Sequence, residues 1–330
     1  MESYFEQKSN ELGFHFDFLE KTYHIAKIIK AISENSLLLN NLTLKGGTAI
    51  NLFWGGFIRL SIDIDLDFTG ALPKDSMDAL RDPLIEKIKE IGSELGYSVK
   101  QRPPSYIIRG FSFKYRPIRR QSDRIKIELN FLNRIPIISR IKRNFHNIFS
   151  EKLGDFGLYT YTIEELIAMK TEAFLNRKFS RDLFDIYSLI KMKNDINYFL
   201  VKKATLLYLC MSPTIISFTK HIEDFKGFME QFISLISNIS EKEFKYEVGN
   251  FLSTKFAITW EEIKNDLIEF YLKNFNLKSN ENDFWKSFFL KNKYNPALLS
   301  EGKNELNKDI DKHPSILHIT EKRSSSTKSY

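Results

Sequence analysis

The sequence predicts an α+β protein, with a sheet-containing part over residues 1–194 and a mainly helical part over residues 195–301. Two stretches, 61–67 and 124–131, alternate strictly between apolar and polar residues. This is typical of strands, because successive side chains of a strand point to opposite faces of the sheet. Later in the chain, apolar residues recur every three or four positions and predict helices. Residues 302–330 are polar, and we expect them to form a mobile tail.

The composition indicates a globular protein and favours a polyanionic partner. A chain of 330 residues, 42% of them hydrophobic and 28% charged, is long enough to bury a sizeable core. Its 29 phenylalanines predict that this core is rich in aromatic rings. Lysine and arginine exceed aspartate and glutamate by 49 − 42 = 7 residues, and a basic balance suits nucleic acid as a partner.

Cysteine usage and hydropathy predict a cytoplasmic protein. The single Cys210 excludes an internal disulfide framework and a cysteine-based zinc cluster, and it suits a reducing compartment. The first residues show no signal-peptide pattern. The most apolar later run, residues 199–218, contains lysines and a proline, so we expect no membrane span.

The first part of the chain is predicted to contain helices and strands in a mixed order. Residues 3–37 have apolar positions at helical spacing and predict a packing helix. A further helix is predicted over residues 75–95, followed by strands over 97–100 and 105–115. Residues 133–149 combine basic and apolar side chains and predict a loop and an amphipathic helix. Contact with RNA phosphates is one interpretation of this charge.

The alternating stretch 61–67 is the first chemical candidate. On a strand, Asp63 and Asp65 share one face with Asp67. Carboxylates lined along one face repel each other unless cations lie between them. Mg²⁺ prefers oxygen ligands and is usually bound by one or two carboxylates together with substrate phosphates. Any half-solvated strand can show the same alternation, so a metal site needs a second observation.

A glycine turn upstream supplies that second observation. Gly46 and Gly47 allow the backbone to approach a phosphate closely, and Thr48 adds a hydroxyl at a predicted helix start. A glycine pair alone is more often just a turn. A turn, a short helix and an acidic strand in succession are much rarer, and they predict a site for a metal ion and a phosphorylated ligand.

A third candidate block follows in two predicted helices. Thr162 and Glu165 form a capping box, which predicts a helix start, and Lys170 lies along that helix. Ser180 is predicted to begin a second helix that carries Arg181. Without further support, these charged residues would be an exposed lysine and part of a surface ion pair.

The segments LKGGTAINL and RLSIDIDLDF resemble the signature of the AbiEii/AbiGii-type nucleotidyltransferase toxins, within the DNA polymerase β-like nucleotidyltransferase superfamily. The resemblance covers roughly the first 190 residues. It implies a polymerase β-like core, in which helices surround a mixed sheet, and nucleotidyl transfer that depends on divalent metal ions.

The resemblance also implies roles for individual residues. Asp63, Asp65 and Glu128 would be the metal ligands and catalytic acids of a two-metal site, although the superfamily more often has aspartate where this chain has Glu128. Lys170 matches the lysine that neutralises the triphosphate, and Asp182 and Asp185 belong to an R-D-x-x-D element behind the site. The nucleotide-binding residues implied besides Lys170 are Lys45, Gly46, Gly47, Thr48, Ser61 and Arg181.

The implied reaction moves a nucleoside monophosphate from an NTP to an acceptor hydroxyl, with Mg²⁺, or Mn²⁺ in its place, as the cofactor. The implied acceptor is RNA, with the 3′ end of tRNA as the first choice. The enzyme would be the toxin of a toxin–antitoxin or phage-defence system, with a cognate antitoxin protein as its partner. Two alternatives stay open: a metal-dependent nuclease, and a nucleotide-binding regulator without turnover.

Overall fold

The computed structural model divides into two compact units. The first unit comprises Met1–Arg134, Arg140–Tyr161 and Asn250–Ala257, and the second comprises Ile135–Ser139, Thr162–Gly249 and Ile258–Tyr330. The structure describes residues 1–54, 58–70, 73–103, 105–145, 148–192, 195–219, 222–299 and 305–326. The domain boundary predicted after residue 194 therefore falls inside the second unit.

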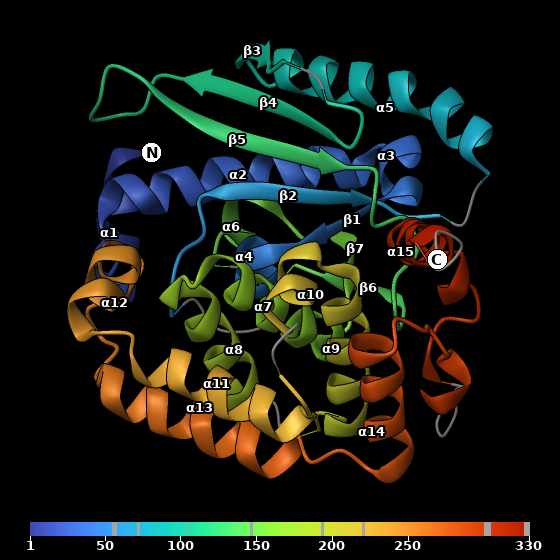
Figure 1. The fold of residues 1–330 in the computed structure, drawn as a ribbon. Helices are drawn as coiled ribbons and strands as arrows, with labels where there is room; N and C mark the ends of the chain where they lie inside the picture. Colours follow the sequence, from blue (N-terminus) through green and yellow to red (C-terminus); the bar gives the residue numbers. More distant parts are fainter. Residues whose placement is uncertain are drawn as a thin grey trace. The chain divides into compact units, whose positions relative to one another are not determined.

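A mixed sheet forms the centre of the first unit (Figure 1). Within the described residues it has seven strands, which in spatial order are β3 (Ser98–Gln101), β4 (Ile108–Tyr115), β5 (Asp123–Asn130), β2 (Asp63–Phe68), β1 (Leu42–Lys45), β7 (Gly157–Tyr161) and β6 (Arg140–Asn144). The pairs β1–β7 and β2–β5 are parallel, and the other neighbouring pairs are antiparallel. This mixed sheet, together with the helices, confirms the predicted α+β class.

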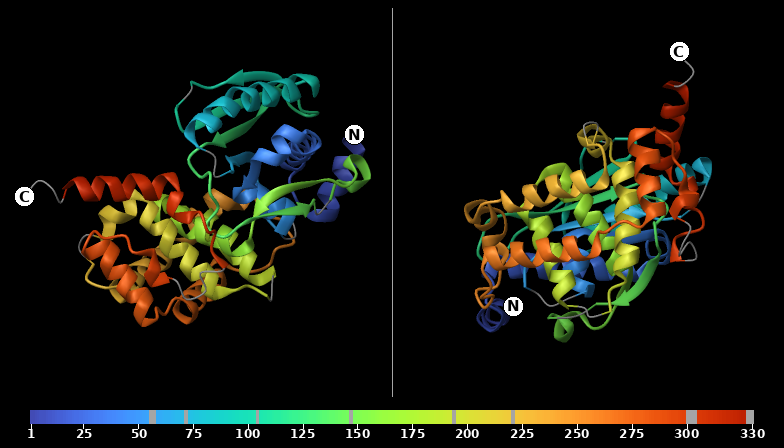
Figure 2. Two further views of the ribbon diagram at one scale, coloured as in Figure 1. Left: turned by 90° about the vertical axis from the view of Figure 1, so that its right-hand side faces the viewer. Right: turned by 60° about the horizontal axis from the view of Figure 1, so that its bottom comes forward.

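One face of the sheet is apolar and carries the core of the first unit. The alternation predicted for the two central strands is confirmed, because their apolar side chains are fully buried: Ile64, Leu66, Ile125, Ile127 and Leu129. Helix α5 (Lys74–Glu94) packs on this face along β3, as the left view in Figure 2 shows. A Cβ added at Gly92 of α5 would lie 2.5 Å from Val99 and 2.6 Å from the Phe113 ring. Glycine therefore allows this helix to approach the sheet closely.

The remaining helices of the first unit lie mainly before β2. They are α1 (Glu2–Leu12), α2 (Phe16–Glu34), α3 (Ser36–Asn41), α4 (Gly46–Ala49), a π-helical turn Ile50–Trp54 and α6 (Ser150–Leu153). Residues 3–37 are largely helical, as predicted, with one break at residues 13–15 and a second at Asn35. Gly13, with a φ of 75°, ends α1 in the left-handed conformation.

The second unit is built from helices. They are α7 (Ile163–Arg177), α8 (Ser180–Met192), α9 (Tyr198–Met211), α10 (Pro213–Phe218), α11 (Phe225–Ser237), α12 (Glu241–Val248), α13 (Trp260–Asn274), α14 (Ser279–Trp285) and α15 (Pro314–Ser326), with short π or 3₁₀ turns at Lys286–Leu290, Pro296–Leu299 and Ile310–Lys312. Helix α15 lies inside the segment predicted as a mobile tail, and residues 302–304 and 327–330 of that segment are outside the described residues. Among the described helices, none is both long and apolar enough to cross a membrane.

Residues 133–149 correct one prediction. In place of a loop and an amphipathic helix, residues 140–144 form β6, which pairs antiparallel with β7. The basic side chains of this strand are partly engaged within the first unit. The guanidinium groups of Arg140 and Arg143 lie over aromatic rings, at 4.2 and 3.9 Å from the ring centroids. Burial lowers the pKa of both groups.

Glu165 is a buried acid that organises the start of the second unit. Thr162 caps α7 as predicted, but the Glu165 side chain does not complete a capping box. It accepts hydrogen bonds from the backbone N–H of Ile137 at 2.6 Å and of Ile138 at 3.0 Å, and from the Tyr208 hydroxyl at 3.0 Å. Burial raises its pKa to about 7, although these donors oppose the shift.

This pKa predicts a pH dependence of stability. Because the folded pKa of Glu165 is raised, its contribution favours the folded state fully below the ordinary value near 4.5 and is lost as the pH rises through about 7. The group should make the protein about 3 kcal/mol more stable at pH 4.5 than at pH 8. We expect Glu165→Gln to remove this difference. Urea unfolding at several pH values measures it, and a variant with the wild-type pH profile would contradict the assignment.

Candidate active site

The glycine turn lies directly against the acidic strand. β1 ends at Lys45, and Gly46 follows with a φ of 71°, a left-handed conformation that favours glycine. A Cβ added at Gly46 would lie only 2.9 Å from Oδ2 of Asp65. Gly46 and Asp65 are nineteen residues apart in the sequence. They nevertheless lie within contact distance of each other in the first unit.

Further contacts fix the turn to the start of β2 and to the residues before it. The Thr48 hydroxyl hydrogen-bonds to the main-chain oxygen of Asp63 and lies 3.0 Å from the Ser61 hydroxyl. A Cβ at Gly47 would lie 2.6 Å from a guanidinium nitrogen of Arg59, so this side chain occupies the space that a residue other than glycine would need. Arg59 is 8% exposed. A buried cation thus lies beside the glycine turn.

The parallel pairing of β2 with β5 brings the distant acid to the same place in the sheet. Asp65 is in register with Glu128, and Asp63 is in register with Lys126, so these four side chains share one face. Glu128 is half exposed and accepts a hydrogen bond from Nη1 of Arg102 at 2.9 Å. The predicted neighbourhood of Asp63, Asp65 and Glu128 is thus present in the backbone register.

Asp67, the third acid of the alternating stretch, has a different environment. It is fully buried, and its carboxylate binds Nζ of Lys45 at 2.6 Å and the Tyr161 hydroxyl at 2.7 Å. Burial raises the pKa of Asp67, and the Lys45 ammonium opposes this shift. The pair links β1 to β2 below the glycine turn, so Asp67 is a structural acid. Lys45, predicted to bind the nucleotide, is engaged with it.

The donor set on this face fits a hard divalent cation. Asp63 and Asp65 offer oxygen ligands only, next to a turn that a phosphate can approach, and Mg²⁺ is usually held by one or two carboxylates plus substrate phosphates. Within the described residues, no group of three or more His, Cys, Asp or Glu side chains is arranged to hold a metal ion. Glu128 would have to exchange Arg102 for a metal ion to act as a third ligand.

Three of the predicted residues, Lys170, Asp182 and Asp185, form a cluster of charged side chains in the second unit. Nζ of Lys170 lies 3.0 Å from Asp182 and 2.7 Å from Asp185, and all three side chains are at most 9% exposed. The Arg177 guanidinium binds Asp182 with two hydrogen bonds of 2.6 Å. Burial alone would raise the pKa of Asp182, but the two cations outweigh it and lower the pKa to about 2. The two positive charges of Lys170 and Arg177 therefore balance the two negative charges of Asp182 and Asp185.

Arg181 lies outside this cluster. Its guanidinium lies 4.9 Å from the centroid of the Phe179 ring, and its backbone N–H donates to Glu247. The predicted helix break at Ser180 is confirmed, because α7 ends at Arg177 and α8 begins at Ser180. The break places Arg177 and Asp182 close enough for their paired hydrogen bonds.

Comparison with known proteins identifies the family. Residues 28–273 match the family described as nucleotidyl transferase AbiEii toxin, type IV toxin–antitoxin system. The chain belongs to the AbiEii nucleotidyltransferase toxin family. This match confirms the resemblance, and with it the activity class: the protein is a nucleotidyltransferase toxin of a toxin–antitoxin system.

The solved structure of MenT4 supports a nucleotidyltransferase fold. MenT4, a nucleotidyltransferase toxin from Mycobacterium tuberculosis H37Rv, is similar over 96% of this chain and 99% of its own, with a TM-score of 0.60 and 14% sequence identity. JHP933 from Helicobacter pylori is 17% identical over 78% of this chain and 92% of its own, with a TM-score of 0.46. No curated protein matches the chain.

Two basic residues of this AbiEii-family site were not among the predicted residues. Arg59 lies beside the glycine turn, and Arg102 binds Glu128. For Arg59 a signal existed, since it stands two positions before Ser61 in the motif RLSIDIDLDF. The sequence contains no such signal for Arg102. Its position next to Glu128 depends on the pairing of β4 with β5, where the Arg102 side chain passes over Gly110.

The glycine turn of this AbiEii-family protein provides a prediction with a matched control. Gly46→Ala would force alanine into a left-handed conformation, at about 1–2 kcal/mol, and would push its Cβ against the Asp65 carboxylate. We expect nucleotidyl transfer to fall by about 10- to 100-fold. Gly96→Ala has the same kind of backbone cost at a φ of 85°, but its Cβ meets nothing within 4 Å. Equal transfer rates in the two variants would contradict the proposed role of the turn.

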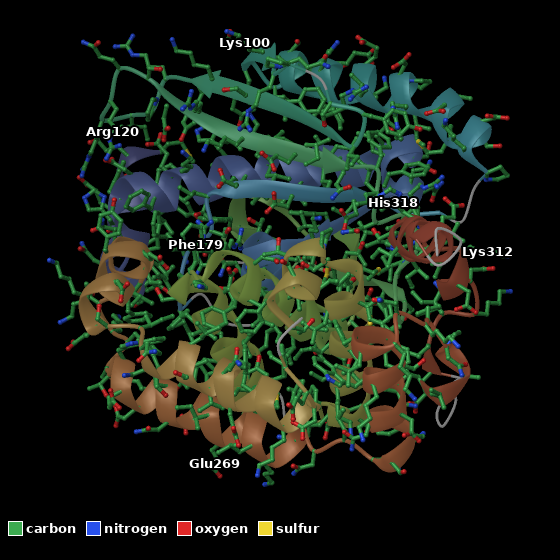
Figure 3. The ribbon with its side chains drawn as sticks, in the orientation of Figure 1. Lys100, Arg120, Phe179, Glu269, Lys312 and His318 are labelled. Carbon is green, nitrogen blue, oxygen red and sulfur yellow. The ribbon has the colours of Figure 1, made fainter. Side chains whose placement is uncertain are left out.

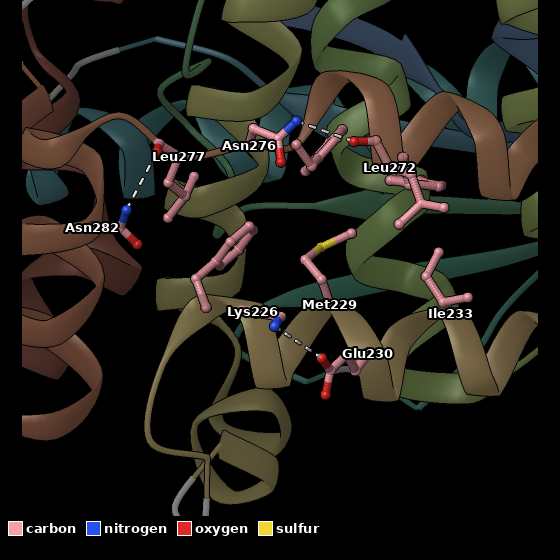
Figure 4. Close-up of a pocket in the computed structure, with 11 residues that line it drawn as sticks. Lys226, Met229, Glu230, Ile233, Leu272, Asn276, Leu277 and Asn282 are labelled. Carbon is pink, nitrogen blue, oxygen red and sulfur yellow. Dashed lines mark hydrogen bonds and ion pairs between the residues drawn. The ribbon is translucent and has the colours of Figure 1, made fainter.

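A pocket lies in the second unit of this AbiEii-family chain (Figure 4). Its volume is about 620 Å³, and side chains of α11 and α13 line it together with Phe275, Asn276, Leu277 and Asn282. The one acid in its lining, Glu230, is ion-paired with Lys226. The pocket has neither a glycine turn nor a pair of carboxylates in its lining, so it is not a candidate site for nucleotidyl transfer.

Proposed function

We propose that the protein transfers a nucleoside monophosphate from an NTP to a hydroxyl of RNA, at a site built from the glycine turn and the acids of β2 and β5. The observation that supports this most is the close approach of Gly46 to Asp65, because Asp65 is itself in register with Glu128. A triphosphate on the turn would thus lie beside carboxylates that can hold a divalent cation.

Each residue of the first unit has a distinct task in this proposal. Gly46 and Gly47 let the backbone approach the phosphates, and the Thr48 hydroxyl keeps the turn in place on the main chain of Asp63. Asp63 and Asp65 would hold Mg²⁺, with Mn²⁺ as a substitute, and Glu128 would act as a further ligand or as a general base. The bound metal would supply charge neutralisation at the triphosphate and activation of the attacking hydroxyl.

The reaction needs positioning and charge neutralisation more than covalent chemistry by the protein. The acceptor oxygen forms a bond to the α-phosphorus, and the bond from that phosphorus to the bridging oxygen breaks, releasing pyrophosphate. The hydroxyl proton leaves to a base, for which Glu128 is the candidate on this face. Arg59, buried beside Gly47, is placed to offset phosphate charge. The family resemblance gives the same task to Lys170.

The biological acceptor and partner complete the proposal. The 3′ end of tRNA is the acceptor that we propose, because blocking it would explain toxicity. A cognate antitoxin protein would neutralise the activity, and phage defence is the setting that we propose for such a pair. The basic excess of seven residues supports an RNA acceptor.

Labelled NTPs and bulk RNA test the activity and separate it from the alternatives. Incorporation of α-phosphate label into RNA, dependent on added Mg²⁺ or Mn²⁺ and abolished by a chelator, is the expected result. Shortened RNA without incorporated label would instead identify a metal-dependent nuclease. Nucleotide binding without any product from total RNA would identify a regulator without turnover. Sequencing of RNA 3′ ends after expression identifies the acceptor.

A further inference from the structure

Beyond the acids, the same face of the sheet carries a strip of basic side chains. We call it the basic strip, and it consists of Lys100 on β3, Lys114 on β4, and Arg124 and Lys126 on β5. All four residues are exposed. Lys100, labelled in Figure 3, lies on the outermost strand of the sheet.

The strand register connects the strip to the acids directly. Asp63 pairs with Lys126, Lys126 with Ser112, and Ser112 with Lys100, so one row of side chains crosses four strands. At about 4.8 Å between strands, this row spans about 14 Å. The next row along the strands contains Arg124 and Lys114. The strip thus begins beside the predicted metal ligand Asp63 and ends at the edge of the sheet.

The charges of the strip are not neutralised by the protein. None of its four side chains forms an ion pair with any residue in the described part of the chain, although many other lysines and arginines do. Asp123, which precedes Arg124 in the chain, is engaged elsewhere, since its carboxylate binds Nζ of Lys21 at 3.1 Å. Four positive charges therefore face solvent on one surface.

The strip also has the shape and the hydroxyl groups of a phosphate-binding surface. An open pocket of about 490 Å³ lies over it. Besides basic residues of the strip, the pocket is lined by Ser98, Ser112 and Ser122, and Asp123 is its one acid. Lysine, arginine and serine side chains are typical donors to the phosphate oxygens of nucleic acids.

We propose that the basic strip binds the phosphates of the RNA acceptor strand and guides its end to Asp63 and Asp65. This inference rests on the proposed transfer to RNA. An acidic protein partner would also meet four positive charges, but the alignment of the row with the acids favours the substrate. A strand whose reacting hydroxyl lies at Asp63 would have its preceding phosphates over the four residues of the basic strip.

The salt dependence of RNA binding tests the strip without any need for turnover. The triple variant Lys100→Ala, Lys114→Ala, Arg124→Ala removes three phosphate contacts. Because each contact with a single strand contributes about 0.7 to the slope of log K against log salt, the slope should become shallower by about 2. Between 50 and 200 mM salt, wild-type affinity for a 20-nucleotide RNA should therefore fall by roughly twentyfold more than that of the variant.

A matched control removes three charges from elsewhere. Lys226→Ala, Lys245→Ala, Lys312→Ala acts on side chains of the second unit that are 84%, 70% and 73% exposed, and it should keep the wild-type slope. Unfolding midpoints should be unchanged for the strip variant, because its side chains are exposed. If the strip variant binds RNA with the wild-type slope, or if both variants lose the same slope, the strip is not the RNA site.

The two proposals can fail separately. If the slope of the strip variant is shallower than that of wild type by about 2, while no label enters RNA, the RNA contact is supported and transfer to RNA is wrong. If label enters RNA equally well in wild type and in the strip variant at limiting RNA, with equal slopes, transfer is supported and the strip is overturned.

Discussion

Replacing Asp65 with asparagine is expected to reduce nucleotidyl transfer by at least about a thousandfold, which corresponds to about 4 kcal/mol of transition-state stabilisation. Asparagine has nearly the same shape but lacks the charge that would hold a divalent cation beside the glycine turn. Asp65 is only partly buried, so the fold should remain intact. Incorporation of labelled nucleotide into RNA measures the loss, and circular dichroism with thermal unfolding checks the fold.

Two controls make this expectation specific to Asp65. Asp155→Asn makes the same change at an exposed acid of the first unit and should leave transfer unchanged. A titration of Mg²⁺ at a fixed NTP concentration tests whether the residual activity of Asp65→Asn requires more metal. A variant that retained a tenth or more of the wild-type rate would show that Asp65 does not hold the metal, and the proposed site would be wrong.

Local patterns in the sequence were sufficient to predict the elements that carry the site. The alternation of β2 and β5 follows from a sheet with one buried and one polar face, and this pattern is visible within eight residues. The glycine turn was recognisable because only glycine readily takes the φ of 71° found at Gly46. The break before Ser180 was visible as a change in capping chemistry.

Features that depend on long-range pairing could not be predicted in the same way. The register of Asp65 with Glu128 depends on a parallel pairing of strands that are more than fifty residues apart, so it entered only through the family resemblance. β6 was missed because its neighbours Ile137 and Ile138 and its own Ile141 have a spacing compatible with a helix. Glu165 satisfied a helix-start motif, but tertiary donors compete successfully for its carboxylate.

Lys170→Met is expected to lower the free energy of unfolding by about 3–5 kcal/mol, the usual cost of removing one partner from a buried ion pair. Asp182 and Asp185 would remain buried, and Asp185 would lose the ammonium at 2.7 Å. In wild type, the pKa of Asp182 is about 2, so its stabilising effect is present above the ordinary pKa and lost as the pH falls through about 2. In Lys170→Met, the stabilising effect of Asp182 should begin to be lost at a higher pH than in wild type. Urea unfolding between pH 2 and 7 measures both effects.

A double variant separates this structural task from the role in nucleotide binding that the family implies. Lys170→Met with Asp185→Asn removes one charge of each sign and leaves the Arg177–Asp182 pair, so most of the lost stability should return. If Lys170 also neutralises the triphosphate, the KM for NTP should stay raised in the double variant. Lys202→Met, which breaks the buried pair with Glu281 at 2.7 Å, controls for destabilisation alone and should not change that KM. A wild-type KM in the rescued double variant would show that nucleotide binding does not need the charge of Lys170. Its only task would then be to neutralise the two buried carboxylates of the ion cluster.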